Sequence, residues 1–64
     1  MTRTEIRARK LAKIIVKADL FDFVLDECQE LCKLAGLEQE WKESDGDTYE
    51  RVVYKAAKIL GVNI

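Results

Sequence analysis

The sequence predicts an all-α fold, a small helical bundle of three main helices plus one short helix, and three observations support it. The chain contains no Pro, so no residue interrupts a helix by lacking an amide hydrogen. Its three glycines, Gly36, Gly46 and Gly61, divide it into segments of helical length. Within these segments apolar residues recur with the period of a helix, and none alternates with the period of a strand.

The length predicts one domain that needs help to be stable. A chain of 64 residues has room for a single helical domain, residues 1–64, and 48% of its residues are hydrophobic. A domain of this size buries only about 60% of the surface of its unfolded chain and is marginal alone. We therefore expect the bundle to be completed by dimerisation, with a second copy in a homodimer or with a different protein partner.

The first helix is expected from Thr4 to Ala18. Thr2, just before it, and Glu5, in its first turn, have the spacing of a capping box, in which side chains accept the free amide hydrogens of the first turn. At 100° per residue its apolar residues form one sector, which comprises Ala8, Leu11, Ala12, Ile14, Ile15 and Ala18. The opposite sector comprises Arg9, Lys10, Lys13 and Lys17.

A turn at Ala18 and Asp19 is expected to end this helix, although neither Gly nor Pro marks the point. A straight helix across it would shift the apolar sector by about 120°, whereas a turn lets both sectors face one core. The alternative is one unbroken helix of about 30 residues, whose middle would be buried nearly all round and would require a dimer.

The second helix is expected from Leu20 to Ala35. Asp19 with Asp22 is a weaker capping box, because Asp is a poorer third-position partner than Glu. Gly36 followed by Leu37 predicts a Schellman motif at the other end. The apolar sector comprises Leu20, Phe21, Val24, Leu25, Cys28, Leu31, Cys32 and Ala35.

A short helix is expected between Leu37 and Ser44, followed by a turn at Asp45 and Gly46. Trp41 in this helix has two interpretations. It covers the open end of the core together with Leu37, four residues before it, or it is an exposed aromatic anchor for a partner, because Trp is enriched in interface hot spots.

The last helix is expected from Thr48 to Leu60. Asp47 with Glu50 predicts a capping box, and Gly61 followed by Val62 predicts a second Schellman motif. The apolar sector comprises Tyr49, Val52, Val53, Ala56, Ala57, Ile59 and Leu60, and it leaves Tyr54 outside, where we expect an exposed side chain without neighbours.

The charges are sorted along the chain. The formal net charge is only −1, but residues 1–18 carry six Lys or Arg against one Glu, and residues 19–50 carry eleven acidic residues against two Lys. Residues 51–64 add three more basic residues. One molecule therefore has separate basic and acidic territories.

The basic row Arg9, Lys13 and Lys17 repeats at four-residue steps, which disfavours an isolated helix. One explanation is internal, because an antiparallel second helix could present the matching row Asp22, Asp26 and Glu30. The others are external: the phosphates of RNA or DNA, an acidic protein surface, or a second copy of the chain. The candidate partner-binding residues are Arg7, Arg9, Lys10, Lys13, Lys17 and Trp41.

Cys28 and Cys32, four residues apart in one helix, are interpreted as small buried hydrophobic residues in a reducing compartment. A redox or metal-sensing role for this pair is the less favoured alternative. The chain has no His, the commonest metal ligand and acid–base catalyst, so we expect no catalytic residue, no metal and no cofactor. We also expect no small-molecule substrate, because nothing predicts a cleft or a phosphate-binding loop.

These observations favour a small regulatory or accessory protein that is not an enzyme. It is expected to act through protein–protein interaction and to self-associate, because the chain is small, its apolar faces are broad and its charges are segregated. We expect it in the cytoplasm, because no segment resembles a signal peptide or a membrane span. The alternative is nucleic-acid binding through the basic N-terminal helix.

Overall fold

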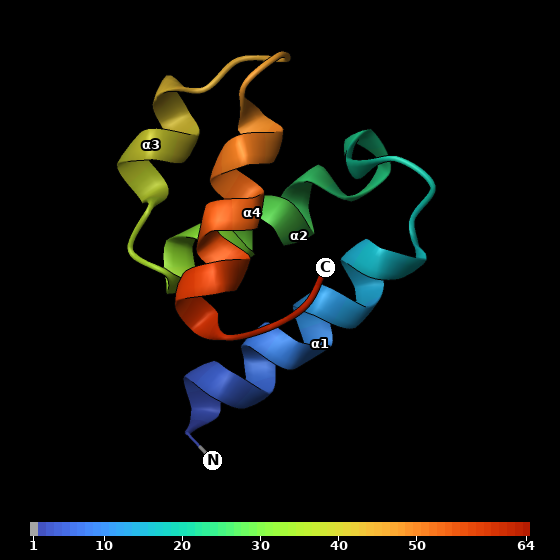
Figure 1. Ribbon diagram of the computed structural model, residues 1–64, viewed down its shortest axis with the longest axis vertical. Coiled ribbons are helices and arrows are strands. Elements are labelled where there is room, and N and C mark those ends of the chain that lie inside the picture. The colour runs from blue at the N-terminus through green and yellow to red at the C-terminus, as the bar shows by residue number, and fades with distance from the viewer. Residues whose placement is uncertain (1) are drawn as a thin grey trace.

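The structure, a computed structural model, describes residues 2–64 and is all-α (Figure 1). Its helices are α1 (Arg3–Lys17), the 3-10 helix η1 (Phe21–Val24), α2 (Leu25–Leu34), α3 (Glu38–Glu43) and α4 (Tyr49–Leu60). Three main helices and a short one are confirmed, as is the break after α1. The second helix differs from its prediction, because its first turn is a separate 3-10 segment.

The central element is α2, which contacts α1, η1, α3 and α4. The chain reverses through residues 18–24, so that α2 packs along α1, and α4 then crosses α2 (Figure 1). After α4 the C-terminal segment runs back across α1 (Figure 1). This route gives α1 a neighbour on each side: α2 on one and the end of the chain on the other.

The core lies where α1, α2 and α4 meet. Its largest fully buried side chains are Leu11, Ile15, Leu31, Val53, Cys28 and Cys32. Ala8 and Ala56 are also fully buried, and such small residues let helices approach closely. The apolar sectors are therefore confirmed at their centres.

The edges of those sectors were predicted wrongly. Ile14, Leu20, Leu25 and Ile59 were placed in the core, but each keeps more than two fifths of its surface exposed. A bundle of this size buries only a narrow stripe of each helix, and these side chains lie at the edge of the stripe.

Three predicted helix ends are confirmed. The Glu5 amide donates to Thr2 Oγ1 at 3.1 Å, which caps α1. Gly36 and Gly61 have φ of 78° and 71°, the left-handed conformation of a Schellman motif. The amide of the residue after each glycine donates to a carbonyl five residues earlier, Leu37 to Cys32 at 2.8 Å and Val62 to Ala57 at 3.0 Å.

The other two predicted caps were wrong. Asp45, not Asp47, accepts the amides of Asp47 and Thr48, and Thr48 Oγ1 accepts the Asp45 amide at 3.0 Å in return. The capping box thus begins two residues earlier than predicted. No side chain caps η1, because Asp22 accepts a hydrogen bond from the Tyr49 hydroxyl instead of completing a box with Asp19.

None of the helices in residues 2–64 combines the length and the apolar character needed to span a membrane.

Candidate functional site

The first candidate surface is the side of α1 that faces α2. Arg7 and Glu30 form a bidentate ion pair, in which Arg7 Nη2 donates to Glu30 Oε1 at 2.9 Å and Arg7 Nε donates to Glu30 Oε2. This contact raises the pKa of the Arg7 guanidinium and lowers the pKa of the Glu30 carboxyl, in each case chiefly through the hydrogen bond. Both side chains are partly open to solvent, so the pair fixes the register of the two helices more than it adds stability.

A second pair between basic and acidic segments joins Lys55 of α4 to Glu40 of α3 at 3.1 Å, but the lysines of α1 are not part of it. Within residues 2–64, no carboxylate lies within ion-pair distance of Lys10, Lys13 or Lys17. Likewise, Asp19 and Asp26 have no Lys or Arg partner among these residues. Of the acidic row, Glu30 is thus ion-paired with α1, and its partner is Arg7, a residue outside the basic row.

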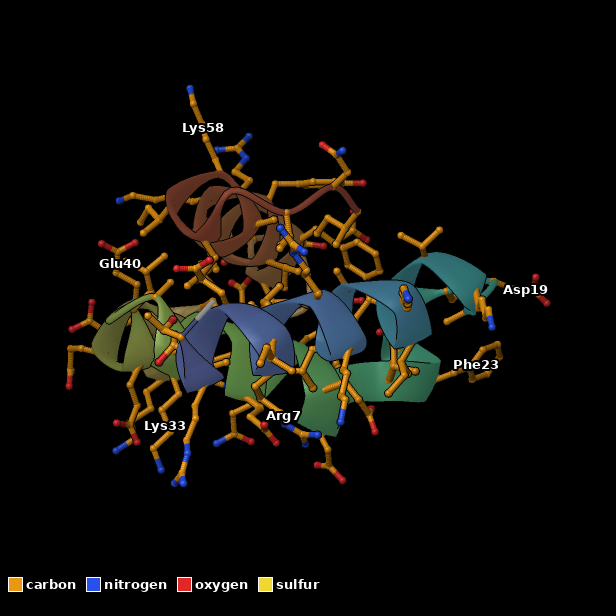
Figure 2. All side chains as sticks on the ribbon, turned by 90° about the horizontal axis from the view of Figure 1, so that it is seen from below. Arg7, Asp19, Phe23, Lys33, Glu40 and Lys58 are labelled. Atoms are coloured by element: carbon orange, nitrogen blue, oxygen red, sulfur yellow. The ribbon has the colours of Figure 1, made fainter. Side chains whose placement is uncertain are left out.

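Ile6, Lys10 and Ile14 follow one another at steps of four residues and therefore share one side of α1. Ile6 and Ile14 of α1 are both 43% exposed, and Phe23 of η1 is 72% exposed, the most of any large hydrophobic residue described. Figure 2 shows Phe23 pointing away from the body at the end of the molecule where η1 lies. We call Ile6, Lys10, Ile14, Phe23 and Asp26 the α1–α2 face.

Two of these residues carried a signal that the sequence interpretation missed. Ile6 and Phe23 stand outside the apolar sectors of their segments, on sides that are otherwise polar. An apolar residue on the polar side of an amphipathic helix cannot serve the core, so this position was itself the indication of a surface role.

The second candidate surface is a groove on the adjacent side of α1, bounded by the C-terminal segment. Its volume is about 480 Å³. Its charged lining comes from the predicted residues Arg9, Lys13 and Lys17, and its apolar lining includes Ala12, Val16 and Val62. The structure thus brings three of the six predicted partner-binding residues into one groove and leaves Arg7, Lys10 and Trp41 outside it.

Trp41 lies at the far end of the core. Leu37 is buried and Trp41 is partly buried against the core, which confirms the interpretation of this pair as a cover. The Trp41 and Tyr49 rings meet edge to face, with centroids 6.0 Å apart. The Tyr49 hydroxyl donates to Asp22 at 2.6 Å, and this bond raises the Tyr49 pKa to about 12.

Tyr54 corrects another expectation. It is about half exposed, as predicted, but it is not without neighbours, since its ring lies 5.6 Å from the ring of Phe21. Phe21 also meets Tyr49, at 6.4 Å between centroids, so the ring of Phe21 joins η1 to the start of α4.

Cys28 and Cys32 are free thiols buried in the centre of the core, as expected of small hydrophobic residues. Burial raises their pKa values to about 12 and about 11. The thiolate is the reactive form, so these groups are poorly suited to redox chemistry in the folded protein. Residues 2–64 contain no cluster of three His, Cys, Asp or Glu side chains that could hold a metal ion.

No protein-family model, curated protein or solved structure matches this chain.

Proposed function

We propose that this protein acts by binding, as a small regulatory or accessory protein that self-associates through the α1–α2 face. The observation that carries the proposal is that exposed apolar side chains of α1 and η1 lie near two charged groups, Lys10 and Asp26, that have no ion-pair partner among residues 2–64. Exposed apolar groups with complementary charge are typical of protein interfaces and are costly to leave in water.

The register of the helices explains why a second copy fits. Arg7 lies against Glu30 in an antiparallel pair, so the direction along α1 from Arg7 to Ile14 matches the direction back along α2 from Glu30 toward η1, which contains Phe23. Counted from the same pair, Lys10 lies level with Glu27, the residue next to Asp26 in the sequence. A twofold axis parallel to the helices would place α1 of one copy over α2 of the other at the same levels.

This arrangement would satisfy both kinds of group together. Ile14 would meet Phe23 of the second copy, and Lys10 would approach its Asp26. The two contacts are repeated by symmetry, because an isologous interface uses the same patch twice. The result would be a bundle with a larger apolar core, which suits a domain near the lower size limit for independent stability.

Gel filtration with light scattering at micromolar concentration tests the proposal. We expect twice the chain mass of 7.4 kDa. Ile14→Asp with Phe23→Asp should give a folded monomer, because both side chains are exposed and their loss leaves the core intact. Lys58→Glu is the matched control, since Lys58 projects into solvent from the side of the molecule opposite Arg7 (Figure 2).

A charge swap identifies the pairing. Lys10→Glu should weaken the dimer, and adding Asp26→Lys to that variant should restore much of the lost affinity. A wild-type chain that remains a 7.4 kDa monomer at about 100 μM, with circular dichroism of a folded protein, would overturn self-association.

Two further parts of the proposal concern location and a second candidate function. We place the protein in the cytoplasm, because two free thiols side by side suit a reducing compartment. The second candidate is nucleic-acid binding through α1, favoured by Lys10, Lys13 and Lys17, which have no acidic partner in the part of the chain that the structure describes. It requires binding of RNA or DNA that falls steeply with salt, and no measurable binding at low salt would remove it.

A further inference from the structure

The groove beside α1 has two kinds of wall. Lys13 and Lys17 have no acidic partner in residues 2–64, and they follow Arg9 at steps of one helical turn. At about 1.5 Å per residue, the row extends over about 12 Å. Val16, which is 58% exposed, and Val62 of the C-terminal segment add apolar surface beside the cations.

This combination selects the chemistry of an occupant. A nucleic acid would use the cations for its phosphates, but no aromatic side chain lines the groove to stack a base, and phosphates gain nothing from valine. An acidic peptide uses both walls, because its carboxylates meet the cations while an apolar side chain covers the valines.

We propose that this groove binds an acidic segment of a partner protein, with carboxylates against the row Arg9, Lys13 and Lys17 and an apolar side chain against Val16 and Val62. Carboxylates four residues apart on a helix repeat at about 6 Å, the same step as the cations. The inference rests on the proposed protein-binding function, but it uses the side of α1 that faces the C-terminal segment, whereas self-association uses the side toward α2.

A fluorescent twelve-residue peptide of three Glu-Leu-Ala-Ala repeats is a suitable probe. We expect it to bind the full chain in low salt with an affinity that falls several-fold as salt rises. The same peptide with Gln in place of Glu should bind at least tenfold more weakly. Lys13→Gln with Lys17→Gln should also lower the affinity at least tenfold, and Val16→Ser should lower it less.

The matched control removes the same charge elsewhere. Lys33→Gln with Lys58→Gln changes two lysines that form no ion pair with any of residues 2–64 and that project from opposite sides of the molecule (Figure 2). This control should change the affinity less than twofold. An equal loss in the control would overturn the groove as the site, because net charge alone would then explain binding.

Two other results would overturn the inference. One is the absence of peptide binding at millimolar concentration in low salt. The other is tighter binding of a twelve-nucleotide oligouridylate that depends on the same two lysines, which would assign the groove to phosphates. Light scattering on the same samples separates this inference from self-association, because a dimer that binds no peptide contradicts only the groove.

Discussion

At the scale of single residues, the start of α4 depends on Asp45. Its carboxylate accepts two amides of the turn that leads into α4, those of Asp47 and Thr48, whereas the Asp47 carboxylate accepts no hydrogen bond from residues 2–64. We therefore expect Asp45→Ala to lower the melting temperature by several degrees, because the turn loses its cap. Asp47→Ala removes the same charge two residues away and should leave the temperature within about one degree. Thermal unfolding followed by circular dichroism compares the two variants. Equal losses of melting temperature would mean that Asp47 contributes to the cap as much as Asp45.

The pH dependence of stability should report the same cap. The amide of Asp47 and the hydroxyl of Thr48 lower the pKa of the Asp45 carboxyl in the folded protein. A carboxyl whose pKa is lower in the folded protein stabilises the fold at pH values above its pKa in the unfolded chain, about 3.9. This stabilisation is lost as the pH falls through the pKa of the folded protein. Stability should therefore decline as the pH drops below about 4, and Asp45→Asn should make that decline shallower.

The mistaken cap shows what the sequence leaves open at this scale. Asp45 and Asp47 flank Gly46, and either can begin a helical turn. Asp45 is the capping residue in the structure because the Thr48 hydroxyl accepts the Asp45 amide and completes the capping box. The sequence does contain that pairing three residues apart, but Thr is a less familiar third member than the Glu50 that suggested Asp47.

At the scale of elements, neighbouring isoleucines of α1 separate core from surface. Ile15 is 1% exposed and Ile14 is 43% exposed. Ile15→Ala should lower the free energy of unfolding by about 2–5 kcal/mol, because it leaves a cavity among α1, α2 and α4. Ile14→Ala should cost under about 1 kcal/mol when the measurement is made on the monomer.

Urea unfolding of both variants at a concentration below that of self-association tests this assignment. Phe23→Asp in each background keeps the chain monomeric under the proposed interface, so that the association energy does not enter the comparison. A loss at Ile14 as large as the loss at Ile15 would mean that the apolar sector read from the sequence was right as first drawn.

The helices themselves were predictable to within one or two residues, because their apolar period and glycine stops are local signals. The 3-10 segment η1 was not. Its residues continue the apolar period of α2, and nothing local distinguishes them. What accompanies η1 is tertiary, since Phe21 contacts Tyr49 and Tyr54 of α4. Such contacts between distant segments are invisible to a reading of periodicity.

At the scale of the whole molecule, the sequence showed separate charged territories but not how they would meet. The structure joins them through Arg7 with Glu30 and Lys55 with Glu40, and among residues 2–64 the lysines of α1 have no acidic partner. The register of the helices decides this, and register cannot be read from the spacing within each row alone. The same chain therefore has a small core and two unsatisfied surfaces, and its stability should depend on what covers them.

The buried thiols can measure that dependence. Cys28 and Cys32 are fully buried in α2, the element that contacts every other helix, so a disulfide reagent reaches them only when the core opens. Burial also holds their pKa values near 12 and 11, which keeps the native thiols protonated at pH 8. Modification should therefore be slow in the native protein and fast in denaturant.

Self-association makes the rate depend on concentration. Because the dimer stabilises only the folded chain, the modification rate at pH 8 should fall as the protein concentration rises from about 1 to 100 μM. Ile14→Asp with Phe23→Asp should remove this dependence, whereas Lys58→Glu should retain it. A wild-type rate that does not change over this range would show that opening of the core is unaffected by a second copy, and the α1–α2 face would then have to be satisfied by a different protein.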